Sequence, residues 1–217
     1  MKNRSVTIID YGAGNILSVR RSLELFNANV LVTSKPEEVR SAERLILPGV
    51  GAFPAAMKAL CELDLVGAIQ DFASNGRPML AICLGMQLLM DASTEQAETQ
   101  GLGIIHGKAI RIPENHEGKE RKVPHIGWNS ISPASTGLHW DQSLLRKTPV
   151  DAEMYFVHSY VVEPENLADK LATSVIDGFT FCSGISKNNV TGFQFHPEKS
   201  STFGLEIMRQ FLELKSV

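Results

Sequence analysis

The sequence predicts an α/β fold: a mostly parallel, open sheet with flanking helices. Short runs rich in β-branched residues alternate with helix-like stretches through the first half of the chain, which is the pattern of βαβ units. One of these runs, 77–83, is apolar almost throughout, as expected for a strand buried on both faces of a parallel sheet. The 217 residues, 43% hydrophobic and 21% charged, suit one globular domain that spans 1–217.

The first half supplies the alternating elements in order. A β-branched strand at 5–10 leads into an amphipathic helix at 18–26. The same alternation then predicts a strand at 30–33, a short helix at 36–41, a strand at 44–47, a helix at 52–75, the strand at 77–83 and a helix at 85–92. Functional groups gather where parallel strands end, so the residues after Ile9, Leu47 and Ile82 are the first candidates for a site.

The second half has shorter strands. We expect them at 109–112, 154–162, 173–176, 178–186 and 190–195, followed by a closing helix at 203–214. Two segments, 113–122 and 131–151, carry most of the uninterrupted polar, Pro and Gly content, and we interpret both as surface loops. No internal repeat or linker divides the domain.

Composition excludes several classes of function. Lys and Arg number 21 and Asp and Glu number 24, for a net charge of −3 without blocks of like charge, so we expect no nucleic-acid partner. The longest apolar runs fall far short of the ~20 residues of a membrane helix, and the first residues do not resemble an export signal. Three widely spaced cysteines, Cys61, Cys83 and Cys182, suit neither a disulfide framework nor a metal motif. These features favour a cytoplasmic protein without a metal site.

A glycine-rich turn at 10–15 superficially suggests a dinucleotide site. Leu17 stands where the third glycine of that fingerprint belongs, and Thr33 and Ser34 end the second strand where a ribose-binding carboxylate is needed. We therefore interpret the segment as a tight turn from strand to helix.

Cys83 has the setting of a reactive nucleophile. Small residues, Ala81 and Gly85, lie two positions away on either side, between a buried strand and a helix, as in a nucleophile elbow. The start of a helix stabilises a thiolate, and the N–H of Leu84 can face an oxyanion. Taken alone, the pattern fits a buried core cysteine equally well.

His196 and Glu198 favour the interpretation of Cys83 as a nucleophile over that of a core cysteine. If strand alternation continues past Phe195, both side chains project to the same side, and the carboxylate can hold the imidazole in one tautomer. A lone histidine at a strand end is more often structural. Together with Cys83, however, the pair completes a nucleophile, a base and a group that orients the base.

Segments 81–87 and 194–200 closely resemble class I glutamine amidotransferases, whose Cys-His-Glu triads release ammonia from glutamine. Segments 10–15, 48–53, 122–129 and 155–160 are similar to the glutaminase subunits of imidazole glycerol phosphate synthases, and the similarity runs from about 6 to 214. It implies a flavodoxin-like architecture and no cofactor. The sequence departs from the family in having Ala81 where glycine is usual and in a longer region at 133–151.

The resemblance also implies roles for individual residues. The catalytic residues are Cys83, His196 and Glu198, and the oxyanion donors come from Gly49, Val50, Gly51 and Leu84. Glutamine is held by Gln87, Glu95, Ser159 and Tyr160, and the partner interface includes Asn15, Pro124, Trp128 and Lys199. From the residues alone, Gln87 could face solvent, Glu95 could be a surface charge and Trp128 could belong to the core.

The implied partner is a cyclase subunit with a (β/α)₈ barrel, forming a heterodimer in which ammonia passes from glutamine to imidazole glycerol phosphate synthesis. The loop at 49–51 would be set productively only when the partner and its ligand are bound. Three alternatives remain: a paralogue supplying ammonia for sugar amidation in surface polysaccharide assembly, an inactive scaffold, and a cysteine hydrolase that works alone on another amide.

Overall fold

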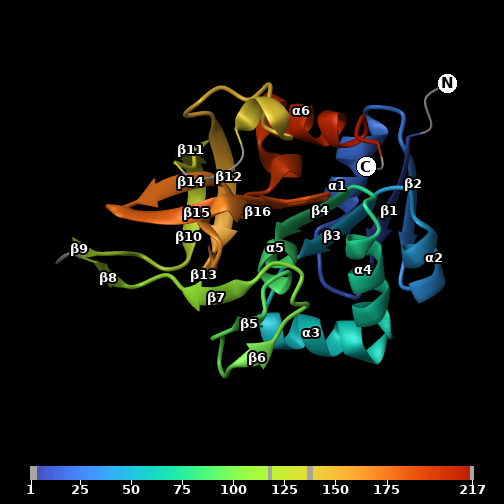
Figure 1. Ribbon diagram of the computed structural model, residues 1–217. Helices are drawn as coiled ribbons and strands as arrows, with labels where there is room; N and C mark the ends of the chain where they lie inside the picture. Colours follow the sequence, from blue (N-terminus) through green and yellow to red (C-terminus); the bar gives the residue numbers. More distant parts are fainter. Residues whose placement is uncertain (1–3, 117–118, 136–138, 216–217) are drawn as a thin grey trace.

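Five parallel strands form the centre of the protein. The computed structural model describes residues 4–116, 119–135 and 139–215. The central strands lie side by side in the order β2, β1, β3, β4, β16 (Figure 1). Their bounds are β1 Ser5–Ile9, β2 Asn29–Thr33, β3 Leu45–Gly49, β4 Met79–Cys83 and β16 Val190–Phe193. This arrangement confirms the predicted α/β fold with a mostly parallel centre.

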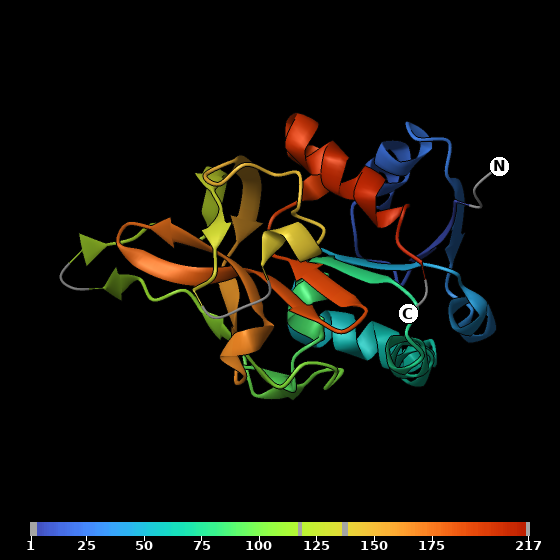
Figure 2. The same ribbon diagram turned by 45° about the horizontal axis from the view of Figure 1, so that its top comes forward.

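Helices cover both faces of this sheet. Figure 2 shows α1 (Ile16–Glu24) and α6 (Ser201–Phe211) on one side, with α3 (Phe53–Glu62) and α4 (Leu65–Ser74) on the other. The short helix α2 (Pro36–Ser41) lies beside α4.

Strand alternation divides the core between the two faces. Ile46, Leu80 and Ile82 face the α1 and α6 side, whereas Leu47 and Ala81 face the α3 and α4 side. Because successive strand residues point to opposite faces, a continuously apolar strand such as β4 fills both cores at once.

The rest of the sheet is mainly antiparallel. After β16 the order continues through β15 (Phe179–Lys187), β13 (Tyr160–Pro164) and β7 (Gly107–Arg111), and β14 (Lys170–Ile176) also pairs with β15. A separate antiparallel pair joins β10 (His125–Ser130) to β12 (Glu153–His158). The shorter elements are β5 Ala92–Ser93, β6 Thr99–Gln100, β8 Asn115–His116, β9 Lys119–Glu120, β11 Ser132–Pro133, and the 3-10 helices η1 Trp140–Gln142, η2 Leu167–Asp169 and η3 Pro197–Lys199.

Two helices differ from the expectation. The predicted helix at 52–75 is two helices, because Asp64 takes a left-handed conformation with φ of 55° and turns the chain between α3 and α4. The helix predicted at 85–92 is α5 (Leu84–Leu88), and it ends early because Ala92 and Ser93 join the sheet beside β7.

The predicted strand at 154–162 was also wrong as a single element. It is two strands, β12 and β13, which meet at Ser159, because the chain leaves β10 there and pairs next with β7 and β15. β10 itself was not predicted, since Pro124 and Gly127 have the composition of a turn.

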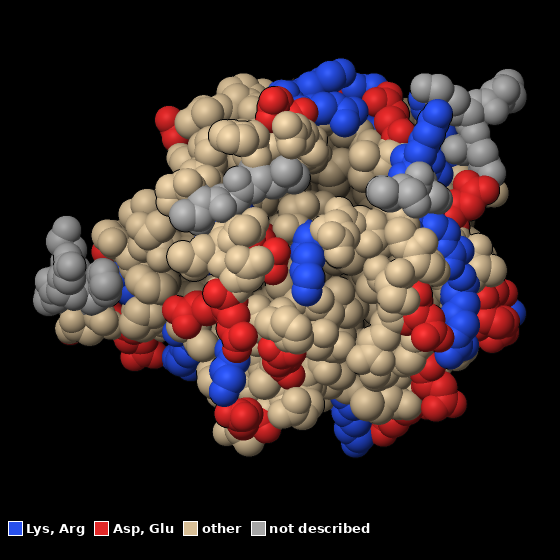
Figure 3. Space-filling view, in the orientation of Figure 1, with Lys and Arg blue, Asp and Glu red and all other residues tan. Residues whose placement is uncertain are grey.

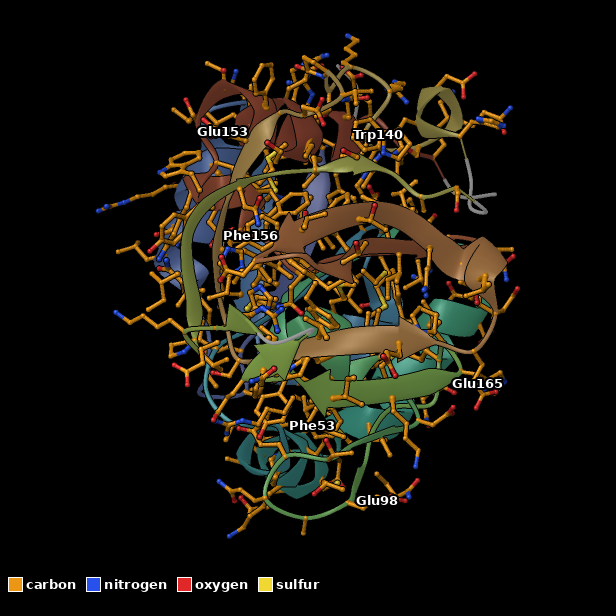
Figure 4. The ribbon with its side chains drawn as sticks, turned by 90° about the vertical axis from the view of Figure 1, so that its left-hand side faces the viewer. Phe53, Glu98, Trp140, Glu153, Phe156 and Glu165 are labelled. Carbon is orange, nitrogen blue, oxygen red and sulfur yellow. The ribbon has the colours of Figure 1, made fainter. Side chains whose placement is uncertain are left out.

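The two segments interpreted as surface loops contain more structure than expected. The described part of 113–122 contains β8 and β9, which pair with each other. In 131–151, Trp140, Leu144 and Leu145 are buried, and the indole of Trp140 donates to Leu171 O over 2.8 Å. Figure 4 shows Trp140 beside the closing helix and Phe156 in the interior, whereas Glu98 and Glu165 lie on the outer margin. The described residues from 139 to 151 therefore help to cover a hydrophobic core.

Charges of both signs are interspersed around the margin of the face shown in Figure 3, and uncharged residues dominate its centre. No helix in the described residues is long and apolar enough to cross a membrane.

Candidate active site

Cys83 lies at the sharp turn between β4 and α5. Its backbone has φ of 55° and ψ of −111°, a strained conformation for a residue with a side chain, and helix α5 starts at the next residue. The turn is close-packed, since a Cβ on Gly85 would lie 2.0 Å from Leu47 O. Ala81 lies in the regular part of β4, paired with Leu47 and Gly192, so its methyl group does not fall within the turn.

His196 and Glu198 form a buried pair. Strand β16 ends at Phe193, and His196 directly precedes η3, so the expected continuation of strand alternation was wrong. The 3-10 turn brings the side chains together instead: His196 Nδ1 and Glu198 Oε1 are 2.8 Å apart, and the two side chains are only 2% and 1% exposed. An ionised carboxylate at this distance fixes the proton on Nδ1, which leaves Nε2 free to act on a substrate.

The side chain of Cys83 also affects the pKa of His196. Burial lowers the pKa of His196, but the side chains of Cys83 and Glu198 outweigh it and raise the pKa to about 10. Nε2 is buried and makes no hydrogen bond of standard geometry within the described residues. Catalytic contacts of this kind often tighten only when substrate binds.

The segment 49–51 borders Cys83. Gly49 ends β3 and is paired in register with Cys83, while Val50 is exposed and Gly51 has φ of 104°. Gly49 must lack a side chain, because a Cβ there would lie 2.5 Å from the Tyr11 hydroxyl and 2.9 Å from Leu84 Cβ. Gly51 has open space around it, so its glycine serves the backbone conformation instead.

Two side chains anchor the ends of this segment. The Tyr11 hydroxyl donates to Pro48 O over 2.9 Å, and Phe53 N–H, at the start of α3, donates to Glu95 Oε2 over 2.7 Å. Burial, assisted by the nearby Cys83, raises the pKa of Tyr11, so its hydroxyl keeps its proton and remains a donor.

A cavity of about 270 Å³ opens beside Cys83. Its lining contains most of the residues that the sequence analysis assigned to the oxyanion and glutamine sites, namely Val50, Gly51, Leu84, Gln87, Glu95, Ser159 and Tyr160. Cys83, Pro124, Val157 and His158 complete the lining. Gly49 is buried at the end of β3, and neither it nor His196 nor Glu198 lines the cavity. The structure thus brings together side chains that are far apart in the chain.

The alternatives for Gln87 and Glu95 do not hold. Gln87 is buried, and its Nε2 donates to Tyr160 O and to Gln194 Oε1, each over 3.1 Å. Glu95 is partly buried, and its carboxylate caps α3 through Phe53 N–H. Both side chains therefore have specific partners at the cavity.

Sequence reasoning missed a buried histidine pair at the cavity wall. His158 Nδ1 lies 2.9 Å from Tyr160 O, and His158 Nε2 lies 3.1 Å from His125 Nδ1. A carbonyl only accepts, so neutral His158 carries its proton on Nδ1 and donates it to Tyr160 O, while its Nε2 accepts a hydrogen bond from the Nδ1–H of His125. Burial lowers the pKa of His158 to about 3 and also lowers that of His125. The sequence of β12 could have revealed His158, because it continues the alternation of inward-facing residues begun by Met154 and Phe156.

The four interface candidates lie outside the cavity or at its rim. Trp128 is 51% exposed, so it is not a core residue; its ring lies 6.0 Å from that of Tyr155, over which Lys199 Nζ lies at 5.8 Å. Pro124 is exposed and lines the cavity, and Asn15 directly precedes α1. No cluster of three or more metal-ligating side chains occurs in the described residues.

Comparisons with known proteins agree with this geometry. A family model described as glutamine amidotransferase class-I matches residues 7–214. Imidazole glycerol phosphate synthase subunit HisH 1 of Legionella pneumophila (strain Lens) is 45% identical, covering 97% of this chain and 99% of that protein. Subunit HisH of Bacillus subtilis (strain 168) is 43% identical, covering 96% of each chain.

The fold also resembles solved structures. PurLQS from Thermotoga maritima superposes with a TM-score of 0.71 at 14% identity, over 96% of this chain and 97% of that one, which supports the fold alone. The sequence matches are far closer and span almost the whole chain. The protein therefore belongs to the class I glutamine amidotransferase family and, within it, to the HisH subunits of imidazole glycerol phosphate synthase.

Proposed function

We propose that this protein hydrolyses L-glutamine to L-glutamate and ammonia and passes the ammonia to a cyclase subunit that makes imidazole glycerol phosphate in histidine biosynthesis. One observation carries the proposal. Cys83 opens onto a cavity with the glutamine-binding candidates, while the hydrogen-bonded pair of His196 and Glu198 interacts with it from the protein interior. A nucleophile, a base and an orienting carboxylate in this arrangement fit acyl transfer from an amide.

The chemistry divides between two steps. The Cys83 thiolate attacks the side-chain amide carbon of glutamine, and protonated His196 gives its Nε2 proton to the departing nitrogen, which leaves as ammonia. A γ-glutamyl thioester remains on Cys83. His196 then takes a proton from water, which attacks the thioester and releases glutamate and the thiolate. Glu198 holds Nδ1 throughout, so the same imidazole nitrogen serves both steps.

The negative charge that develops on the amide oxygen needs donors. The N–H of Leu84, directly after the nucleophile, supplies one, and a backbone N–H of the 49–51 segment supplies the other. Loss of one such donor typically costs ~10²–10³ in rate. We propose that rotation of this segment, between its anchors at Tyr11 and Glu95, gates the reaction when the partner and its ligand bind.

The amino-acid end of glutamine belongs at the opposite wall of the cavity. Glu95 offers a carboxylate to the α-ammonium group, and the backbone at Ser159 and Tyr160, where β12 ends and β13 begins, is suited to receive the α-carboxylate. Gln87 holds the backbone of this wall in place through its hydrogen bond to Tyr160 O.

The relatives are named as subunits of a synthase, which favours a partner. Ammonia released into neutral water is protonated and loses its nucleophilicity, so direct transfer to a second site is advantageous. We propose a heterodimer with a (β/α)₈-barrel cyclase in the cytoplasm. The contact surface includes Asn15, Pro124, Trp128 and Lys199. The relatives' names favour the histidine pathway over sugar amidation.

A glutaminase assay tests the proposal. Glutamate release is measured for the chain alone, with its cyclase subunit, and with the cyclase and the cyclase ligand, beside Cys83→Ala in each mixture. We expect a rise of at least about 100-fold on addition of the liganded partner, consistent with completion of an oxyanion site, and no turnover by Cys83→Ala. Equal and vigorous turnover in every mixture contradicts the gating, and turnover by Cys83→Ala contradicts the mechanism. Growth rescue of a histidine auxotroph distinguishes the histidine pathway from sugar amidation.

A further inference from the structure

Gln194 contacts the nucleophile, although the sequence analysis gave it no role. It follows β16 directly and is fully buried. Its Nε2 lies 3.6 Å from Cys83 Sγ, and its Oε1 lies 3.1 Å from Gln87 Nε2. Because a buried amide without partners is costly, a glutamine held in this position has a specific set of hydrogen bonds to satisfy.

One backbone carbonyl decides which way both amides point. Tyr160 O can only accept, so the Gln87 atom that faces it, 3.1 Å away, is the NH₂ group. The second hydrogen of that group points to Gln194, which must then present its oxygen. The other end of the Gln194 amide, its NH₂ group, is consequently the end that faces Cys83. Tyr160 O thus fixes the orientation of both amides.

We propose that Gln194 stabilises the Cys83 thiolate by donating a hydrogen bond from Nε2 to Sγ, and that Gln87 positions the Gln194 amide for this task. The inference rests on the proposed role of Cys83 as the nucleophile. It assigns Gln87 a positioning role within the protein besides any contact with glutamine.

The other groups around Cys83 Sγ explain why the N–H of Gln194 matters for the thiolate. Besides His196, whose side chain interacts with Cys83, Sγ has Val157 O at 3.7 Å among the described residues; that carbonyl can accept from a thiol but offers nothing to a thiolate. Helix α5 contains only five residues, little more than one turn, so its aligned dipoles are few. A side-chain N–H aimed at the sulfur therefore adds a stabilising interaction that the short helix alone does not provide.

Titratable groups face Cys83 from several elements. His196, before η3, interacts with it directly, and Tyr11, after β1, is close enough for the sulfur to raise its pKa. His158 of β12 and Glu95, after β5, line the same cavity. A substitution at Gln194 leaves all four in place, so it isolates the contribution of the amide donor.

The test is the pH dependence of Cys83 alkylation. The purified full-length chain is treated with iodoacetamide from pH 5 to 10, and peptide mass spectrometry follows each cysteine separately. In Gln194→Met, which keeps the size of the side chain and removes the donor, we expect the midpoint for Cys83 to rise by about one pH unit. The rate at neutral pH should fall up to about tenfold.

The chain provides matched controls. Cys61 is exposed on α3, so its alkylation profile should be the same in every variant. Gln210→Met makes the same substitution at a fully buried glutamine on α6 whose amide has no hydrogen-bond partner among the described residues, so it controls for general loosening of the core. Its Cys83 midpoint should match that of the wild-type chain.

Gln87→Glu tests the positioning separately. Glutamate at 87 offers no N–H to Gln194, so the Gln194 amide is expected to turn and present Oε1 to the sulfur. The Cys83 midpoint should rise by about one pH unit. A simple effect of the new charge would persist when Gln87→Glu is combined with Gln194→Met, whereas an effect carried by Gln194 should largely disappear in the double variant.

The outcomes separate this inference from the proposed function. An unchanged Cys83 midpoint in folded Gln194→Met overturns the inference even if the complex releases glutamate. If Gln194→Met does not fold, an unchanged midpoint in Gln87→Glu overturns it instead. Conversely, a shifted midpoint sustains the inference even when the wild-type complex fails to release glutamate, since alkylation requires neither glutamine nor a partner.

Discussion

The hydroxyl of Tyr11 donates a hydrogen bond of 2.9 Å to the carbonyl of Pro48, the residue that precedes the loop at 49–51. Tyr11 follows β1 and Pro48 lies in β3, so the bond joins the ends of two neighbouring parallel strands. It holds the loop at the point where it leaves the sheet.

Tyr11 and Gly49 should be energetically coupled. A Cβ on Gly49 would lie 2.5 Å from the Tyr11 hydroxyl, so Gly49→Ala should destabilise the fold by about 1–3 kcal/mol through overpacking. Tyr11→Phe should cost about 1–2 kcal/mol, because it leaves Pro48 O without this donor. It also removes the overlapping oxygen, so the double variant should be more stable than the sum predicts. Urea unfolding of the four proteins measures the coupling.

Gly51→Ala is the control for that cycle. Its φ of 104° is strained for alanine, but no atom lies near the added Cβ, so its effect should add to that of Tyr11→Phe. Strict additivity of Gly49→Ala and Tyr11→Phe would contradict the proposed contact.

Glu198→Gln should change the pH dependence of catalysis. The amide oxygen can still accept from His196 Nδ1, but the negative charge is lost, so the pKa of His196 should fall below about 10. We expect turnover by the assembled complex to decrease at least about 100-fold and its alkaline limb to move to lower pH. Glutamate release measured from pH 6 to 10.5 checks both.

The same pKa affects stability in a defined direction. Since His196 holds its proton more tightly when folded, this contribution is complete below pH 6.5 and is lost as the pH rises to about 10. The free energy of unfolding should decline less over that interval in Glu198→Gln. An identical decline in the two proteins would show that the carboxylate does not hold the proton.

His158 should make the protein sensitive to acid. Burial lowers its pKa to about 3, so the unfolded chain binds a proton below pH 6.5 that the folded chain excludes. The stability from neutral His158 is present above pH 6.5 and is lost as the pH falls toward 3, by up to about 5 kcal/mol. His158→Asn, whose amide can still donate to Tyr160 O, should flatten the acid limb of stability.

His106→Asn is the matched control, because His106 is exposed. Chemical unfolding at several pH values between 4 and 7 should give the wild-type slope for His106→Asn and a shallower one for His158→Asn. Equal slopes in all three proteins would exclude His158 as the sensitive group.

Trp128 should anchor the partner. It is half exposed and packs edge-on against Tyr155, as expected of an aromatic residue that becomes buried when a partner protein binds. Trp128→Ala should weaken cyclase binding by about 30-fold or more while leaving the unfolding free energy within about 1 kcal/mol. Leu31→Ala, an exposed position on β2, should bind normally. Calorimetric titration measures both, and equal affinities would place the interface elsewhere.

The sequence determined the elements and the chemical groups. Alternating strands and helices, the apolar run of β4 and the small residues around Cys83 are local signals, because side-chain periodicity and turn geometry extend over a few residues. They predicted the parallel centre and the place of Cys83 at the turn between a buried strand and a helix. His196 and Glu198 were also identified as a pair, although by a wrong conformation, since no local signal distinguished an extended strand from the turn at η3.

Only the tertiary structure decided which groups meet. The bond from Gln194 to Cys83, the capping of Phe53 by Glu95, and the contact between His125 and His158 each join segments that are distant in the chain. Such contacts depend on strand order and register, which are set by the packing of whole faces and leave little trace in the composition of any one segment. The sequence therefore specified what could react, and the packing of the sheet and its helices specified how the reacting groups are oriented.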